Sequence, residues 1–164
     1  MNQTEHSSVI KCREIFTQLG VKGEIIKTNE SARTAQEAAD ALGVEVGQIV
    51  KSLLFKANDQ AVMVLTSGSN RIDTEKVANA LGVQKVEKAD ADLVRNATGY
   101  AIGGVPPFGH ATKFQIFIDP DLAKYETVWA AAGHPYYVFP TTFDELVILS
   151  EGTVQNVNLI SQGK

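Results

Sequence analysis

The stretch best suited to chemistry is the glycine- and proline-rich segment from Gly103 to His110, Gly-Gly-Val-Pro-Pro-Phe-Gly-His. Its two adjacent prolines lack backbone N–H donors and bias the residues before them toward extended geometry, so neither a helix nor an inner strand fits here. Its glycines permit positive φ and close approach of another group. Such a loop can present main-chain N–H groups to an anion or to negative charge that develops in a reaction. The same composition also suits a tight turn that caps a strand, and the residues alone leave both interpretations open.

Other residue types give little support to nucleophilic or metal chemistry. The single cysteine, Cys12, lies on a predicted helix, where we expect a small packing residue and not a nucleophile. The three histidines, His6, His110 and His134, have no metal-ligand spacing with one another or with the cysteine, so we expect no metal and no other cofactor. The sequence does not indicate a catalytic Cys-His dyad or Ser-His-Asp triad. His110 follows the loop closely enough to reach a ligand bound there.

Length and charge narrow the class of protein. A chain of 164 residues is long enough for a sizeable core, and we expect one domain over 1–164. The net charge of −4 argues against a broad basic face for nucleic acid, although a few local cations would suffice to hold an RNA end. We find no apolar run as long as a membrane span and no signal peptide at the N-terminus. One cysteine allows no intramolecular disulfide, so we expect a cytoplasmic protein without membrane contact.

Hydrophobic spacing places the loop among alternating helices and strands. Helices are expected over 8–19, 34–43, 73–82, 90–96 and 142–149. Strands are expected over 23–27, 50–56, 61–66, 85–87, 114–119, 127–131 and 136–139, and a polar loop over 28–33. Short turns join 50–56 to 61–66 and 127–131 to 136–139, whereas helices separate other strands, so the sheet must be mixed. The expected fold class is α/β or α+β, with a mixed, curved sheet flanked by helices.

Four short segments occur in order along the chain: Lys51-Ser52-Leu53 on a strand, Asp73 with Lys76 at the next helix, Thr98-Gly99-Tyr100, and Gly103-Gly104-Val105-Pro106-Pro107. Together they resemble the YbaK/prolyl-tRNA synthetase editing-domain superfamily. The resemblance extends from about 34 to 149. Its most specific part is the Gly-x-x-x-Pro loop combined with the earlier lysine.

The resemblance implies an enzyme that hydrolyses wrongly aminoacylated tRNA and, because the chain carries no synthetase segments, a free-standing form that acts in trans. It implies that Lys51, Gly103 and Gly104 carry the catalysis. The lysine would hold the terminal phosphate or the developing charge, and glycine N–H groups would stabilise the oxyanion. The attack is then assisted by the substrate, for instance through its ribose 2′-OH. The expected substrate-binding residues are Ser52, Val105, Pro106, Pro107, Phe108 and His110.

The expected substrate is tRNA for proline that carries a non-cognate small amino acid, bound by its acceptor 3′ end, with an aminoacyl-tRNA synthetase as a further partner. The nearly uncharged stretch from Gly133 to Val138 differs from the free-standing cysteinyl deacylases and puts cysteine specificity in doubt. Two other classes also fit the residues. One is a non-catalytic module that binds a nucleotide or a tRNA end, and the other is a small-molecule ester or amide hydrolase.

Overall fold

The computed structural model describes residues 6–29 and 34–160. Most of the N-terminal stretch over 1–8, on which the prediction about a signal peptide rests, and most of the predicted loop over 28–33 lie outside the described residues. The α-helices begin at polar residues whose side chains accept a backbone N–H, and they end in left-handed residues, which is typical helix capping. They are α1 Ser7–Leu19, α2 Ala35–Leu42, α3 Thr74–Leu81, α4 Ala91–Thr98 and α5 Phe143–Ser150.

A five-stranded sheet forms the larger part of the fold, in the order β4-β2-β3-β5-β8. Strands β2 and β3 form the predicted antiparallel hairpin, with Lys51 opposite Thr66, while β5 adds parallel to β3 and β8 adds parallel to β5. The mixed character of the sheet is therefore confirmed. The strands are β2 Val50–Ala57, β3 Gln60–Ser67, β4 Glu87–Lys88, β5 Gln115–Ile118 and β8 Thr153–Val154.

A second, three-stranded sheet, in the order β1-β7-β6, is a feature that the sequence did not separate from the first. It contains β1 Ile26–Lys27, β6 Val128–Ala131 and β7 Tyr137–Thr141, all antiparallel. A single parallel bridge between Ile49 and Trp129 connects the start of β2 to β6. Two 3-10 helices, η1 Val46–Gln48 and η2 Pro120–Lys124, precede β2 and follow β5.

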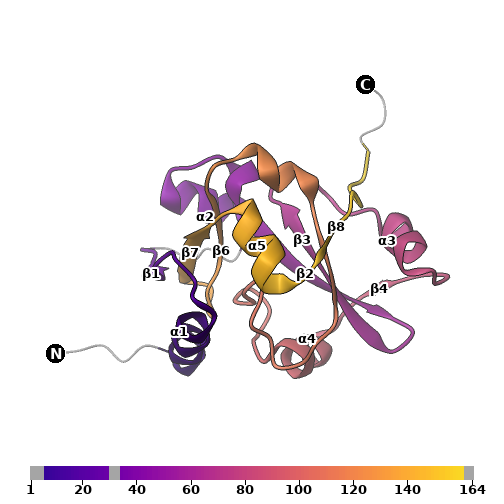
Figure 1. Ribbon diagram of the computed structural model, residues 1–164, viewed down its shortest axis with the longest axis horizontal. Coiled ribbons are helices and arrows are strands. Elements are labelled where there is room, and N and C mark those ends of the chain that lie inside the picture. The colour runs from indigo at the N-terminus through magenta and orange to yellow at the C-terminus, as the bar shows by residue number, and fades with distance from the viewer. Residues whose placement is uncertain (1–5, 30–33, 161–164) are drawn as a thin grey trace.

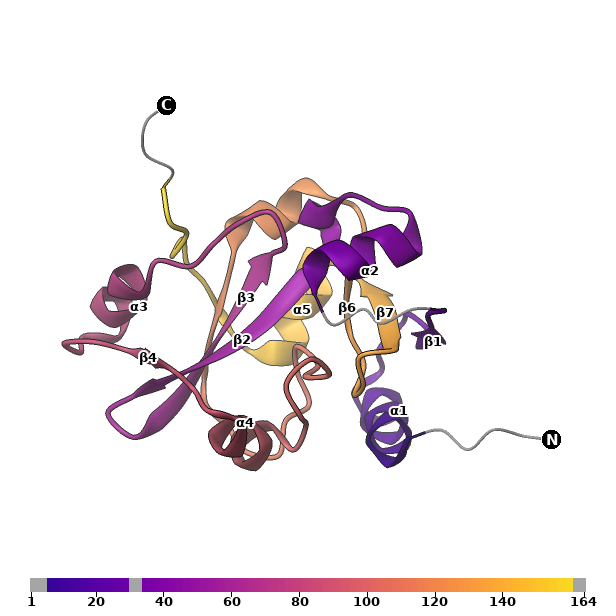
Figure 2. The same ribbon diagram turned by 180° about the vertical axis from the view of Figure 1, so that it is seen from behind.

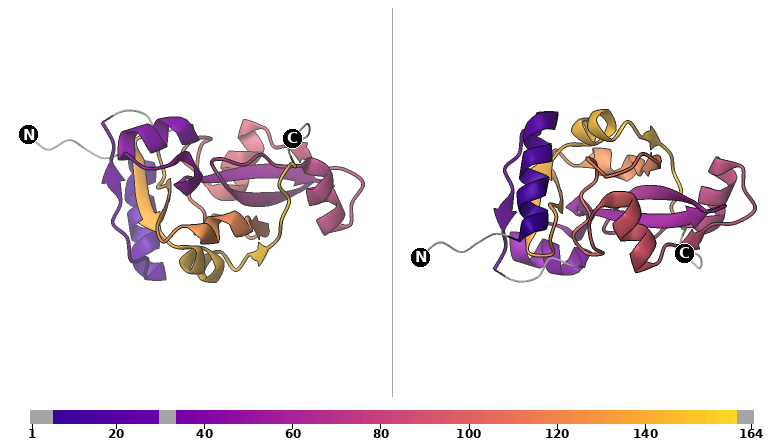
Figure 3. Two further views of the ribbon diagram at one scale, coloured as in Figure 1. Left: turned by 90° about the horizontal axis from the view of Figure 1, so that it is seen from above. Right: turned by 90° about the horizontal axis from the view of Figure 1, so that it is seen from below.

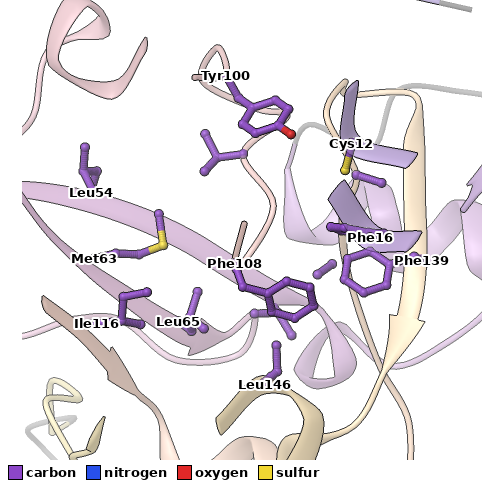
Figure 4. Packing of buried hydrophobic residues seen from close by; sticks show 14 of the residues in the cluster. Cys12, Phe16, Leu54, Met63, Leu65, Tyr100, Phe108, Ile116, Phe139 and Leu146 are labelled. Carbon is purple, nitrogen blue, oxygen red and sulfur yellow. The ribbon is translucent and has the colours of Figure 1, made fainter. Parts of the chain in front are cut away.

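The small sheet and α1 lie at one end of the molecule, and α3 with β4 lies at the other (Figure 1, Figure 2). The β2–β3 hairpin runs between these ends (Figure 3). One cluster of buried side chains joins both sheets, with Phe16, Phe108 and Phe139 in contact at ring-centroid distances of 4.6–5.8 Å (Figure 4). Among the helices of the described residues, none combines the length and apolar character that crossing a bilayer requires.

Candidate active site

A cleft of about 530 Å³ lies where the start of β2 passes the loop after α4 and the edge of the small sheet. Four predicted site residues line it: Lys51, Ser52, Gly103 and Val105. Its volume is within the range of about 300–1,000 Å³ that is typical of small-molecule sites. Much of the remaining wall is apolar and includes Ile49, Leu54, Val94, Ile102, Trp129 and Val138.

Three cations, Lys51, Arg71 and Lys88, line the cleft, and no Asp or Glu does so among the described residues. Lys51 Nζ donates to the main-chain oxygen of Asn70 at 2.7 Å. Desolvation lowers the pKa of Lys51, nearby Arg71 lowers it further, and Asp119 acts in the opposite direction. The cleft is therefore locally positive in a chain whose net charge is −4, which suits a phosphate or a developing negative charge.

The two glycines of the loop have different surroundings. Gly103 has φ of 94°, in the left-handed region, and its N–H has no acceptor among the described residues. The Gly104 N–H, in contrast, donates to the Ala101 oxygen at 3.0 Å, and the Gly104 oxygen accepts from the Gly133 N–H at 2.8 Å. Gly104 thus closes a tight turn, as one interpretation of the loop expects, and the Gly103 N–H has no acceptor in the part of the chain that the structure describes. The predicted catalytic role of the Gly104 amide does not fit, because that donor is already used.

Ser52 lines the cleft and carries an unpaired side-chain oxygen. Its Oγ is buried and has no hydrogen-bond partner in the described residues. The Leu54 oxygen accepts from the Ala89 N–H, so the alternation along β2 directs the Ser52 N–H and C=O toward the same side, away from β3. Pairing with β4 involves only Phe55 and Lys56, so it stops before Ser52. Buried polar atoms are normally paired, so the unpaired Ser52 Oγ is suited to a ligand.

Phe108 is not at the cleft, contrary to the prediction. Its side chain is 1% exposed and packs between Phe16 and Phe139 in the core. Pro106 and Pro107 are also buried and do not line the cleft. Gly103 and Val105 line the cleft on one side of the loop, and the aromatic residue is buried on the other side, where it removes a large apolar surface from water.

His110 contacts the loop that it follows and not the cleft. Its Nε2 lies 2.7 Å from the Pro106 oxygen, and its ring stacks on Phe114 at a centroid distance of 5.0 Å. Burial lowers the pKa of His110, although the bond to Pro106 acts in the opposite direction. A neutral ring that donates from Nε2 fits these contacts, and His110 does not line the cleft.

Three cleft residues were not predicted as site residues from the sequence. Arg71 and Lys88 are two of several charged residues outside the four matching segments, and Trp129 reaches the cleft from the small sheet. The interpretation of Cys12 as a packing residue is confirmed, because its side chain is fully buried and desolvation raises the pKa of its thiol to about 12. Within residues 6–29 and 34–160, no three His, Cys, Asp or Glu side chains gather closely enough to hold a metal ion.

Comparisons with known proteins point to one family. Residues 29–149 match the sequence profile of the aminoacyl-tRNA editing domain. The chain is 32% identical over 127 residues to the uncharacterized protein YwhH of Bacillus subtilis, with 77% of this chain and 80% of that protein covered. It is 29% identical over 127 residues to a proline–tRNA ligase of Thermoanaerobacter sp., covering 76% of this chain but 22% of the ligase. The solved structure of a candidate trans-editing enzyme for prolyl tRNA synthetase has a TM-score of 0.89 and 39% identity, with 96% of this chain and 100% of that chain covered.

Proposed function

Because the chain belongs to the aminoacyl-tRNA editing domain family, we propose that it is a deacylase that acts in trans on mischarged tRNA. The proposed substrate is tRNA for proline that carries a non-cognate small amino acid. The observation that carries the proposal is the combination, in one cleft, of the half-buried Lys51 ammonium with the unpaired Gly103 N–H. A cation and a fixed amide donor are the groups that an ester carbonyl needs as it gains negative charge.

The proposed reaction is hydrolysis of the ester between the amino acid and the terminal ribose. A water oxygen bonds to the carbonyl carbon, and the carbonyl oxygen takes the negative charge, which the Gly103 N–H stabilises. The bond to the ribose oxygen then breaks, and that oxygen takes a proton. The described lining residues include no His, Cys, Asp or Glu that could act as a base, so we assign the proton transfer to the substrate. The neighbouring ribose 2′-OH accepts the proton of the attacking water and passes its own proton to the leaving ribose oxygen.

Substrate binding is divided among three kinds of groups. Lys51, Arg71 and Lys88 suit the phosphates of the tRNA end, and the Trp129 ring suits stacking on the terminal base. The Ser52 C=O suits the α-ammonium of the amino acid. The cleft thus gives the tRNA end local positive charge although the chain as a whole is acidic. The proposed reaction takes place in the cytoplasm, where tRNA is aminoacylated.

The apolar wall gives limited discrimination among amino acids. One methylene in such a pocket changes binding by only about 1–3 kcal/mol, so neighbouring small amino acids are accepted together. We therefore expect hydrolysis of several related esters on tRNA for proline, and not of a single one.

The test is deacylation of tRNA for proline that carries alanine, serine, cysteine or threonine, by the wild type and by Lys51→Ala. Loss of one preorganised charge-stabilising group predicts a fall in rate of about 100-fold or more for the esters that the wild type hydrolyses. Lys56→Ala is the matched control, since Lys56 lies on the same strand but outside the cleft, 49% exposed and 3.5 Å from Asp59. It should retain the wild-type rate.

The deacylation assay distinguishes the proposed enzyme from the two alternative classes of protein. If folded Lys51→Ala hydrolyses the esters at the wild-type rate, Lys51 has no part in the mechanism. If the wild type hydrolyses none of the esters but binds a non-hydrolysable aminoacyl-adenosine analogue tightly, the protein is a binding module. Hydrolysis of simple aminoacyl esters at the same rate as charged tRNA indicates a small-molecule hydrolase.

A further inference from the structure

The position of the Lys51 ammonium depends on one neighbouring loop. Lys51 Nζ donates to the main-chain oxygen of Asn70, which follows β3, at 2.7 Å. The side chain of Asn70 is itself anchored: its Nδ2 donates to Asp119 Oδ2 at 2.8 Å and to Asp121 Oδ2 at 2.9 Å. The acceptor that holds the lysine is thus fixed by two carboxylates behind it.

Asp119 is the centre of this arrangement and is only 1% exposed. Besides Asn70, its carboxylate accepts hydrogen bonds from four other donors. These are Thr66 Oγ1 at 3.1 Å, Ser67 N at 3.0 Å, Asp121 N at 2.9 Å and Asn158 Nδ2 at 3.0 Å. Burial acts to raise the pKa of Asp119, but these hydrogen bonds outweigh it and hold the pKa below its ordinary value. The carboxylate is therefore charged, and a buried charge with this many donors is a rigid anchor.

We propose that Asn70, anchored on the Asp119 carboxylate, is a positioning residue that fixes the Lys51 ammonium in the cleft. This inference deepens the function proposed above and rests on it for its effect on turnover. Asn70 itself is not among the residues that line the cleft, and it acts through the lysine.

A lysine at this place needs such support. Its side chain has several rotatable bonds, and holding it in one geometry costs conformational entropy. Arg71, the residue after Asn70, repels the ammonium within the same partly desolvated cleft, whereas the charge of Asp119 attracts it. The hydrogen bond to Asn70 and the attraction to Asp119 both draw the ammonium back toward the loop, against the repulsion from Arg71.

The test compares Asn70→Ala with Thr66→Val. Each variant removes a donor to Asp119, but only Asn70→Ala also frees the loop that holds Lys51. Both variants are expected to fold and to be somewhat less stable than the wild type. In Thr66→Val, valine keeps the shape of the threonine side chain. The titration of Lys51 is followed by NMR in protein labelled with carbon-13 lysine, with Lys51→Arg to identify the signal, and deacylation kinetics are measured in parallel.

In Asn70→Ala the ammonium moves toward solvent, so we expect the pKa of Lys51 to rise toward the ordinary lysine value. We also expect kcat to fall about 10- to 100-fold, the cost of displacing a catalytic group by about 1 Å, with KM changed less than about twofold. Thr66→Val should match the wild type in both readouts. An unchanged Lys51 titration in folded Asn70→Ala, or an equal shift in Thr66→Val, overturns the proposal.

The two proposals fail in different ways. The lysine titration requires no substrate, so it tests the positioning role even if the wild type hydrolyses no ester. A shifted titration with no deacylation by any form rejects the proposed function and retains the role of Asn70. If Asn70→Ala deacylates at the wild-type rate and the Lys51 titration is unshifted, the positioning role of Asn70 is rejected and the proposed function is retained.

Discussion

Substitution of Gly104 by alanine tests how the loop is held against the small sheet. A Cβ added at Gly104 would lie 2.7 Å from the His134 nitrogen and 2.8 Å from the Gly133 carbonyl carbon. Both neighbours are main-chain atoms of the turn between β6 and β7, and they cannot move aside as a side-chain end can. The loop must therefore move away from the turn, and the hydrogen bond from the Gly133 N–H to the Gly104 oxygen is strained with it.

The size of the displacement follows from the contact. The distance to the His134 nitrogen is about 0.7 Å shorter than the 3.4 Å at which ordinary contact begins. Overpacking of this kind costs about 1–3 kcal/mol of folding free energy. Gly103 is the adjacent residue, so its N–H moves by a similar distance, and misplacement of a catalytic group by about 1 Å lowers the rate up to about 100-fold.

Gly152→Ala is a matched control for this substitution. Gly152 lies between α5 and β8, and a Cβ there would lie 2.9 Å from the Ile116 oxygen on β5, a main-chain contact of similar severity. Neither Gly152 nor Ile116 lines the cleft. Urea denaturation should show a comparable loss of stability in both variants. Single-turnover deacylation, measured well below the unfolding transition, should be slow only in Gly104→Ala.

Wild-type deacylation by a folded Gly104→Ala would refute this reasoning, because the Gly103 amide would then tolerate displacement or have no role. Equal loss of activity in both variants would also refute it, since activity would then follow global stability and not the position of the loop.

Two further predictions concern the residues that support the site. Phe108→Ala should lower the free energy of unfolding by about 3–5 kcal/mol, because the ring is buried between Phe16 and Phe139, and a loss under about 1 kcal/mol in urea denaturation would contradict that packing role. Asp119→Asn should destabilise the protein by about 1–3 kcal/mol at neutral pH, since an amide cannot accept from all five donors. The pKa of Asp119 is below its ordinary value of 3.8 in the folded protein, so its contribution is full above that value and is lost as the pH falls through the lower folded pKa. The stability difference from Asp119→Asn should therefore shrink on acidification in urea titrations, and a difference that is constant with pH would be the contrary result.

Local features of the fold were predictable from the sequence because their causes are local. Thr34, Asp73 and Asp90 each accept a backbone N–H at a helix start, and glycines end the same helices in the left-handed conformation. The hairpin of β2 and β3 needs only the two-residue turn at Asn58 and Asp59, both with positive φ. The division into two sheets had no such signal, since it depends on pairing between strands far apart in the chain, such as β1 with β7.

The site was predictable only in part for the same reason. The resemblance identified Lys51, Ser52 and Gly103, and all three line one cleft. The sequence could not distinguish the free amide of Gly103 from the engaged amide of Gly104, because the difference depends on which loop residue closes the turn to the Ala101 oxygen. Nor could it assign Phe108, since an aromatic residue in a loop suits a ligand contact and a core contact equally well.

The two groups that we propose act on the ester, the Lys51 ammonium and the Gly103 N–H, are supported by different parts of the fold. The ammonium of Lys51 is held by the five-stranded sheet and the Asp119 carboxylate that follows β5, whereas the loop of Gly103 rests on the β6–β7 turn of the small sheet. Their separation is therefore fixed by neither sheet alone but by the way the two sheets meet. The main-chain bridge from Ile49 to Trp129 lies at that junction, and the side chain of Trp129 is part of the cleft wall. Since the bridge uses main-chain atoms, a change of the Trp129 side chain leaves it in place, and its effect on activity reports on contact with the substrate and not on the spacing of the two groups.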